Sequence, residues 1–433
     1  LHLLSAILTL AAGPVFHASW GGKDATYWCL YVAMFMFSLG NGLGEAVINP
    51  LTATLYPKNK THWLNILHAA WPAGLILGAA FGYLFVGKTA HATQLRWEIP
   101  MLVFMVPTVL YGVLTLKNKF PVSEASAAGV GLGTMIATIL TSPMFLFLIF
   151  IHALVGYQEL GTDSWIQNIM KNVIPGNETL LFIYTSGLMF ILRFFAGPIV
   201  HKINPLGLLF VSACCAALGL FSLGMATTGL LVVAAATIYG VGKTFLWPTM
   251  LGVAGERFPK AGALGMGMLG GVGMLSAGFL AGPGIGYKQD YNASKDLKAT
   301  APAAYDRYKA AEKNSFLFFP AIQGLDGSKV AIVEDTGKGM TEEMALNAKN
   351  NKKDENLDKL NTWWTTAKLT ATQDKEPVIK ARLYGGRMAL KLTALVPTTM
   401  AVCYLLLVAY FVSKGGYKAI HLDANGNEIE SGH

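Results

Sequence analysis

The sequence predicts an all-α membrane protein, in which a bundle of helical spans carries a hydrophilic insert before its last helix. Hydrophobic residues fill 53% of the 433 positions and charged residues only 13%, about half the usual share of charge in a soluble domain. The charge is also uneven, because residues 287–387 hold 31 of the 58 charged side chains. Outside this insert the chain therefore lacks the polar surface that a water-soluble protein needs.

Ten segments have the length and apolar character of membrane spans. A helix needs about 20 mostly apolar residues to cross the bilayer, because in lipid its backbone groups must be satisfied within the helix. The first segment begins without a methionine, so we expect it to be the remainder of a span in an N-terminally incomplete chain. In chain order the segments are 1–16, 28–55, 64–87, 98–116, 136–167, 179–200, 206–226, 229–254, 262–286 and 388–413.

A linker at 117–135, which begins with small and polar residues, divides the spans into four and six. Residues 1–116 then form an incomplete N-terminal half, 136–286 the first five helices of a C-terminal half, and 388–413 the last helix. The intervening insert alternates Lys with Asp and Glu, which indicates a small helical cap or a partly ordered loop. Its aromatic anchors are Phe316–Phe319 and Trp363–Trp364.

The short loops carry more cations on one side of the membrane than on the other. Nine Lys and Arg side chains fall on the side of the linker and of the tail 414–433, and four fall on the opposite side. The positive-inside rule therefore places the tail in the cytoplasm and the insert outside, in a multi-pass protein of the plasma or inner membrane. The nine are Lys58, Lys60, Lys117, Lys119, Lys202, Arg257, Lys260, Lys414 and Lys418; the four are Lys23, Lys88, Arg96 and Lys171.

Charge and motif patterns argue against several classes of ligand. Membrane topology explains the net charge of +8 better than a nucleic-acid partner does. The string GVGKT, which ends at Thr244, looks like part of a phosphate-binding loop, but Thr237 replaces its first glycine and such a loop cannot form inside a lipid-spanning helix. The four cysteines lack metal or disulfide spacing. We expect no nucleic acid, metal, nucleotide or redox cofactor.

The second span carries polar side chains where the bilayer makes them costly. In the segment GNGLGEAVINP, Asn41, Glu45 and Asn49 recur every four residues and therefore share one helix face. A carboxyl group in a low-dielectric cavity can bind and release a proton. We interpret Glu45 as a proton-coupling group, with Asn41 and Asn49 beside it in a substrate path. The alternative is a structural Glu45 that hydrogen-bonds a neighbouring helix.

The third span begins LNILHAAWPAG, in which Asn65, His68 and Pro72 follow one helical stripe and Trp71 lies beside it. An amide, an imidazole and an aromatic plane together suit the hydroxyl groups and the apolar face of a sugar ring. We therefore interpret Asn65, His68 and Trp71 as substrate-binding residues. In the alternative reading, His68 completes an internal hydrogen bond and Trp71 packs against lipid.

The fifth span places His152, Glu159 and Asp163 on one face, with Gln158 adjacent. Intramembrane acids are candidates for function by default, because a charge at the centre of a span costs roughly 2.5–3.5 kcal/mol on insertion scales. We interpret Gln158 and Glu159 as substrate-binding residues. Asp163 is near the expected outer boundary, where water can reach it.

In the eighth span, Tyr239, Lys243 and Trp247 share a helix face and are our remaining candidates for substrate binding. A cation in the middle of a span needs a partner. Lys243 could neutralise Glu45 or Glu159, or it could bind an anionic substrate. A fixed ion pair that joins two parts of the bundle is the structural alternative.

Several of these segments resemble a known family. The stretch LRFFAGPIVHKINPLGLL is similar to the signature that transporters of the major facilitator superfamily carry between the second and third helices of each six-helix half, with Arg193, Gly197 and Pro198 before a basic turn at Lys202. GNGLGEAVINP resembles the fourth helix of the fucose-permease-like branch, LNxxHxxxxxG the start of its fifth, and WPTMLG its tenth.

The resemblance implies a major-facilitator-type bundle in two halves, whose ten spans correspond to helices three to twelve. It also implies that Glu45 is the fourth-helix carboxylate that couples proton movement to sugar binding, and that Asn65 faces the substrate cavity. The chain departs from the pattern at His68, where the branch has Gln, and at Lys243, which is an additional intramembrane cation.

We therefore expect a secondary active transporter, not an enzyme, that takes up a sugar or sugar acid with a proton or another coupling cation by alternating access. It would work as a monomer in the bilayer. One alternative is a transporter of another small solute, for nucleoside transport or drug efflux. A non-transporting receptor is another. A membrane-embedded transferase is disfavoured because the strings D-D-x-x-D and H-E-x-x-H do not occur.

Overall fold

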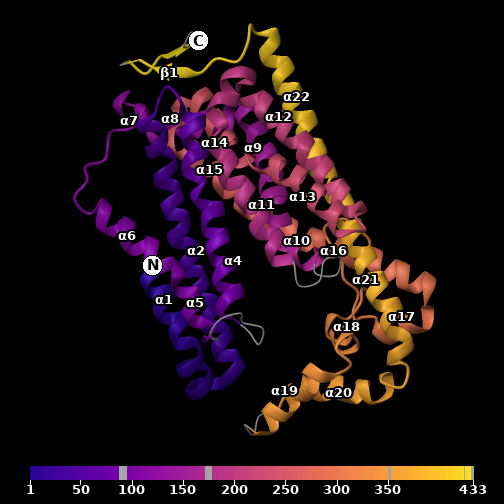
Figure 1. The fold of residues 1–433 in the computed structure, drawn as a ribbon. Helices are drawn as coiled ribbons and strands as arrows, with labels where there is room; N and C mark the ends of the chain where they lie inside the picture. Colours follow the sequence, from indigo (N-terminus) through magenta and orange to yellow (C-terminus); the bar gives the residue numbers. More distant parts are fainter. Residues whose placement is uncertain (87–94, 171–177, 350–352, 424, 431–433) are drawn as a thin grey trace.

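The computed structural model describes residues 1–433 except 87–94, 171–177, 350–352, 424 and 431–433. Figure 1 shows a bundle of helices with a smaller group of helices at one end. Eight described helical segments are long and apolar enough to cross a membrane, and each overlaps one of the ten predicted spans. The predicted spans 1–16 and 179–200 coincide with the shorter apolar helices His2–His17 and Thr179–Arg193. The prediction of an all-α membrane bundle is confirmed.

Residues 1–116 form helices that follow the first four predicted spans. The second span is one long helix that tolerates a proline, Pro50, whereas the third is divided at Ala69. The elements are α1 (His2–Ala11), the π-helix η1 (Ala12–Gly21), α2 (Gly22–Leu55), α3 (Lys60–His68), α4 (Ala70–Phe85), α5 (Glu98–Met101), the 3₁₀-helix η2 (Leu102–Phe104) and α6 (Met105–Thr115).

The next predicted spans are more interrupted than their hydropathy suggests. The segment 136–167 is not one helix, because a new helix begins at Pro143 and the Ser142 hydroxyl accepts a hydrogen bond from the amide of Phe145. A later helix is kinked at Asn204, which has a φ of 55° and directly precedes a proline. The elements are α7 (Glu124–Ala127), α8 (Leu132–Thr141), α9 (Pro143–Gly156), the π-helix η3 (Tyr157–Gly161), α10 (Thr162–Met170), α11 (Glu178–Arg193) and α12 (Ala196–Met225).

The chain then returns twice across the bundle before it enters the insert. The eighth predicted span consists of two helices that meet at Thr244 and Phe245. The ninth continues past its predicted end at residue 286 as a helix that reaches Thr300. The elements are α13 (Gly229–Lys243), α14 (Leu246–Arg257), the 3₁₀-helix η4 (Pro259–Ala261), α15 (Gly262–Leu275), the π-helix η5 (Ser276–Ala281) and α16 (Gly282–Thr300).

The insert is a small helical cap with its own apolar core. Tyr308, Val333 and Val378 are fully buried in that core, and Arg307 donates two hydrogen bonds to the carboxylate of Asp374. The α16 helix packs along α21, which begins well before the predicted last span and leads the chain back to the bundle (Figure 1). The elements are α17 (Pro302–Tyr308), α18 (Gly327–Glu334), α19 (Lys338–Lys349), α20 (Glu355–Ala367), α21 (Ala371–Thr393) and α22 (Leu395–Ser413).

At the opposite end, which we call the tail end, the linker and the C-terminal tail meet both halves (Figure 1). The tail forms a hairpin of two antiparallel strands, β1 (Ile420–Leu422) and β2 (Glu428–Glu430). The carboxylate of Glu124 accepts hydrogen bonds from Lys60 at 3.1 Å and from the amide of Leu422 at 2.7 Å. Several of the nine cations that the sequence places on the side of the linker and the tail lie at this end. Lys88 and Lys171, assigned to the other side, lie outside the described residues.

A second acid joins the halves at the tail end. Glu256 of α14 accepts hydrogen bonds from the Thr61 hydroxyl at 2.7 Å and from the Tyr417 hydroxyl at 2.8 Å. Lys60 also donates to the backbone oxygen of Gly255 at 3.0 Å. Residues of the first half, the second half and the tail therefore share one network.

We expect Glu124→Gln to lower the free energy of unfolding by about 1–2 kcal/mol, because Lys60 and the amide of Leu422 lose a charged acceptor. Burial raises the pKa of Glu124, but Lys60, the Leu422 amide and His421 lower it more, so this pKa lies below its ordinary value. The stabilisation is therefore complete above the pKa of an unfolded Glu, about 4.3, and is lost as pH falls through the folded value. Thermal unfolding in detergent across this pH range measures it.

The matched control is Glu376→Gln, because Glu376 pairs with Lys380 on an exposed helix face of the insert. We expect that substitution to change stability little at any pH. Equal effects of the two substitutions at neutral pH would contradict the role of Glu124.

Candidate functional site

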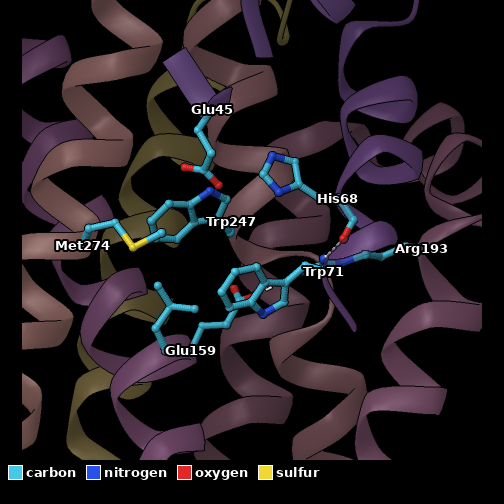
Figure 2. A pocket seen from close by; sticks show the side chains of 8 residues that line it. Glu45, His68, Trp71, Glu159, Arg193, Trp247 and Met274 are labelled. Carbon is cyan, nitrogen blue, oxygen red and sulfur yellow. Dashed lines mark hydrogen bonds and ion pairs between the residues drawn. The ribbon is translucent and has the colours of Figure 1, made fainter. Parts of the chain in front are cut away.

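A cavity that is partly open to its surroundings lies between the first and second halves of the bundle. Its walls come from α2, α3 and α4 on one side and from η3, α11, α14 and α15 on the other. Figure 2 shows the polar and aromatic side chains of these helices facing one another. The residues that line the cavity are Glu45, His68, Trp71, Glu159, Leu160, Arg193, Trp247 and Met274.

The guanidinium of Arg193, at the C-terminal end of α11, is the most connected group at this cavity. It donates through Nε to the backbone oxygen of Thr244 at 2.8 Å and through Nη2 to Oε1 of Glu159 at 3.0 Å. Nη1 donates to the backbone oxygen of His68, which belongs to the first half. The side chain is only 1% exposed, so these acceptors replace the water that a buried cation would otherwise require.

Two prolines explain why backbone oxygens are available to Arg193. In a continuous helix, each carbonyl accepts from the amide four residues later, and proline has no amide hydrogen to donate. Pro72 is four residues after His68, and Pro248 is four residues after Thr244. Each proline follows a tryptophan just after a helix interruption. The two Trp-Pro pairs therefore free the two carbonyls that Arg193 binds, and they place Trp71 and Trp247 at the cavity.

Glu159 lies in a π-helical turn, η3, between α9 and α10. Such turns are frequent at functional sites because they rotate side chains out of the regular helical phase. Oε1 of Glu159 is paired with Arg193, while Oε2 is buried and makes no hydrogen bond with any residue that the structure describes. A close approach of α9 and α15 brings this turn inward, since a Cβ on Gly156 would lie 2.0 Å from the backbone oxygen of Gly273.

Glu45 enters the cavity from α2. Figure 2 shows its carboxylate pointing toward the Trp247 ring, and a Cβ on Gly270 would lie 3.8 Å from its Oε2. Within the described part of the chain, no ion pair or hydrogen bond to this carboxylate is present. The Trp247 ring also packs against His152, with 4.6 Å between ring centroids. Glu45 is therefore the acid of the cavity whose charge is not matched by a cation.

Five of the predicted site residues line the cavity: Glu45, His68, Trp71, Glu159 and Trp247. Asn49 and Asn65 are buried and do not line it. Nε2 of His68 contacts Oδ1 of Asn49 at 3.0 Å, so the structure supports both the cavity position and the internal hydrogen bond of His68. Asn65 donates to Thr249 at 3.1 Å, while its own Oδ1 is buried without a partner among the described residues.

Four predicted residues lie elsewhere. Asn41 contacts Nε2 of His2 at 3.1 Å within the first half. Lys243 pairs with Asp163 at 2.5 Å, so its partner is neither Glu45 nor Glu159. The Tyr239 hydroxyl donates to the same Asp163 carboxylate at 3.2 Å. Gln158 is fully buried, and its amide atoms make no hydrogen bond with the described residues.

Sequence reasoning missed Leu160, Met274 and above all Arg193 as site residues. Arg193 was noticed only as part of a family signature. The signal that could have found it is the repeated Trp-Pro pair, because each proline in a span frees a carbonyl that must find another donor. Leu160 and Met274 carry no such signal, since apolar residues are common in every span.

Helices interrupted around a central polar cavity, in an apolar bundle of two halves, define a secondary transporter by class. The profile of the Major Facilitator Superfamily matches residues 2–282. This chain therefore belongs to the Major Facilitator Superfamily, as the sequence resemblance predicted, and its family is one of transporters rather than enzymes.

Solved structures show the same fold at low sequence identity. The transporter FucP in its outward conformation has a TM-score of 0.53 and 16% identity, over 67% of this chain and 75% of that one. A variant of the E. coli fucose:proton symporter FucP gives 0.52 and 17% over the same shares. An inward-facing bacterial homologue of the human lysosomal transporter Spinster gives 0.51 and 12%, over 95% and 82%. Comparison with curated proteins gives no match.

We expect Arg193→Gln to lower the free energy of unfolding by about 3–5 kcal/mol, because it leaves the buried Glu159 carboxylate unpaired. Adding Pro72→Ala should recover about 1 kcal/mol of this loss, since the new amide can donate to the backbone oxygen of His68. Unfolding of the single and double variants in detergent measures the coupling.

Pro50→Ala is the matched control, because Pro50 also lies inside a span but frees no carbonyl that Arg193 binds. Pro50→Ala should change the free energy of unfolding by the same amount in the protein with Arg193 and in the Arg193→Gln variant. If Pro72→Ala behaved like Pro50→Ala in both backgrounds, the link between Pro72 and Arg193 would be refuted.

Proposed function

We propose that this protein is a proton-coupled symporter that takes up a neutral, sugar-like solute through the cavity between its halves. The observation that carries the proposal is that one cavity joins the uncompensated Glu45 of the first half to the Glu159–Arg193 pair of the second. A coupling acid and a polar binding site must share one chamber if proton binding is to depend on substrate binding.

The chemistry of the walls supports a solute rich in hydroxyl groups. Trp71 and Trp247 offer aromatic planes for the apolar face of a sugar ring, and Oε2 of Glu159 is an acceptor that still needs a donor. The fold shared with a fucose:proton symporter is consistent with this class.

The charges of the cavity favour a neutral solute over a sugar acid. Two carboxylates, Glu45 and Glu159, line it together with one cation, Arg193. That cation already donates to Glu159 and to two backbone oxygens. Lys243 is committed to Asp163 and does not line the cavity. An anionic substrate would therefore find no free cation among the lining residues, and it would meet an excess of negative charge whenever Glu45 is ionised.

Proton coupling is assigned to Glu45 because its charge has no matching cation in the cavity. Protonation removes that charge, which lowers the cost of closing the two halves over it. Alternating access requires the halves to rock about the bound solute. The hydrogen bond from Arg193 to the backbone oxygen of His68 crosses between the halves, so it is a contact that such rocking would break and re-form.

We further propose that the protein is a monomer of the plasma or inner membrane, with the tail end in the cytoplasm and the insert outside. The excess of cations in the short loops of the tail end supports this orientation. The substrate would then enter from the side of the insert.

We expect Glu45→Gln to abolish proton-driven accumulation while counterflow exchange continues, because the glutamine keeps the size of the side chain but cannot release a proton. The assay uses protein reconstituted in liposomes, with an imposed pH gradient for accumulation and preloaded solute for exchange. Glu376→Gln, in the exposed face of the insert, is the control and should accumulate normally. Normal proton-driven accumulation by the Glu45→Gln variant would show that Glu45 is not the proton-coupling acid.

A competition panel tests the substrate class. We expect neutral hexoses and deoxyhexoses to inhibit or drive counterflow, and the corresponding uronic acids to be weaker by about tenfold or more, roughly 1.4 kcal/mol. Nucleosides serve as a comparison, because tryptophan planes can also stack on bases. Stronger competition by uronic acids would contradict the charge argument without affecting the role of Glu45.

A further inference from the structure

Tyr239, which the sequence predicts to bind substrate, does not line the cavity but contacts the turn that carries Glu159. Its side chain is fully buried. Its hydroxyl lies 3.3 Å from the backbone oxygen of Gln158 and 3.2 Å from Oδ1 of Asp163, so its one proton serves two acceptors. The side-chain amide of Gln158 makes no hydrogen bond with the described residues, so Gln158 is held here through its backbone.

The carboxylate of Asp163 is held by a second residue of the same helix, α13. Nζ of Lys243 lies 2.5 Å from Oδ2 of Asp163 and 5.4 Å from the centre of the Tyr239 ring. Close backbone contact with α12 fixes α13, since a Cβ on Gly219 would lie 2.4 Å from the backbone nitrogen of Tyr239. Tyr239, Lys243 and Asp163 thus form one fixed cluster, which we call the Tyr239 cluster.

Glu159 lies between two helices whose rotations are fixed separately. On one side, Gly156 of α9 lies against the backbone of Gly273 in α15. On the other side, the Tyr239 cluster holds Asp163 at the start of α10. One residue of a regular helix corresponds to a rotation of about 100°, and the π-helical turn η3 accommodates the additional residue between the two fixed points. Release of Asp163 would let η3 relax toward a regular helix and turn Glu159 relative to Arg193.

The same end of α13 also contacts the cation that pairs with Glu159. The backbone oxygen of Thr244, the residue after Lys243, accepts a hydrogen bond at 2.8 Å from Nε of Arg193. Nη2 of Arg193 in turn donates to Oε1 of Glu159 at 3.0 Å. Residues 239–244 therefore hold both the turn before Glu159 and its cationic partner. Oε2 of Glu159 is left as a buried acceptor without a partner among the described residues.

We infer that Tyr239 is a positioning residue for solute binding, which with Asp163 and Lys243 holds η3 in the turn that presents Glu159 to the cavity. The inference rests on the proposed function, because it takes Glu159 as an acceptor for the solute. Tyr239 acts through Glu159 and does not itself touch the solute. Loss of its hydroxyl therefore weakens solute binding but leaves the proposed proton-coupling acid, Glu45, unchanged.

The test is counterflow of L-fucose, a neutral deoxyhexose, by the full chain in liposomes. Tyr239→Phe keeps the ring and removes the hydroxyl. We expect its KM to rise about fivefold at an unchanged maximal rate, which is the effect of one hydrogen bond. Tyr184→Phe is the matched control, because the Tyr184 hydroxyl lies 2.8 Å from Oγ1 of Thr237 on the same helix α13 but not at η3. Its KM should equal that of the unaltered protein.

A double-variant cycle separates positioning from general damage to the bundle. In a Glu159→Gln background, Tyr239→Phe should raise KM by less than about twofold, because the carboxylate through which Tyr239 acts is absent. Thermal unfolding in detergent checks that each variant is folded. Asp163→Asn is a second position should Tyr239→Phe fail to fold, because it removes the charge that Lys243 binds, and it should raise KM in the same way.

Three outcomes overturn the inference: an unchanged KM for the folded variant of Tyr239 or Asp163, an equal rise for Tyr184→Phe, or the same rise in the Glu159→Gln background. Two other outcomes overturn the proposed function instead. They are the absence of counterflow of L-fucose and of other neutral hexoses by the unaltered protein, and an unchanged KM for Glu159→Gln. The failure of the inference is thus distinguishable from the failure of the proposed function.

Discussion

The buried guanidinium of Arg193 is the constraint on which the centre of this molecule depends. A cation inside a membrane bundle must be surrounded by acceptors, because the penalty for leaving it unpaired is several kcal/mol. Here the acceptors are one carboxylate and two backbone oxygens, and they come from three different helix interruptions. Satisfying Arg193 therefore fixes the relative positions of α3, α11 and α13, and with them the approach of the two halves.

The same constraint shapes the cavity. Each proline that frees a carbonyl for Arg193 is preceded by a tryptophan, so Trp71 and Trp247 are brought to the walls by the interruptions that Arg193 stabilises. Because Arg193 bonds only to Oε1 of Glu159, Oε2 is a buried acceptor without a hydrogen-bond partner among the described residues. The groups that satisfy the interrupted helices are thus also the groups that form the polar wall of the cavity.

The fold was largely predictable because hydropathy and helix length are local properties of the sequence. Glu45, Trp71 and Glu159 were predictable for the same reason. A polar or amphipathic residue within a span is costly in contact with lipid, so it usually faces the interior of the bundle or a cavity. The partner of Lys243 was not predictable. Helical spacing placed Lys243 inside a span and suggested Glu45 or Glu159, whereas the acid that it meets is Asp163, which the sequence places near the outer boundary. The Ser142–Pro143 break was overlooked since the surrounding segment is uniformly apolar, although a serine before a proline is a local helix-start signal.

The long insert could have separated the last helix from the bundle, and the structure shows why it does not. The family profile ends at residue 282, yet α22 packs against α12 and α9 as a member of the bundle. The chain leaves as α16 and returns as α21, and these helices pack together with Gly385 so close to α16 that a Cβ would lie 2.4 Å from the backbone oxygen of Gln289. Such a pair returns the chain to the membrane close to where it left. The position at which the chain re-enters the bundle as α22 is therefore independent of the size of the cap.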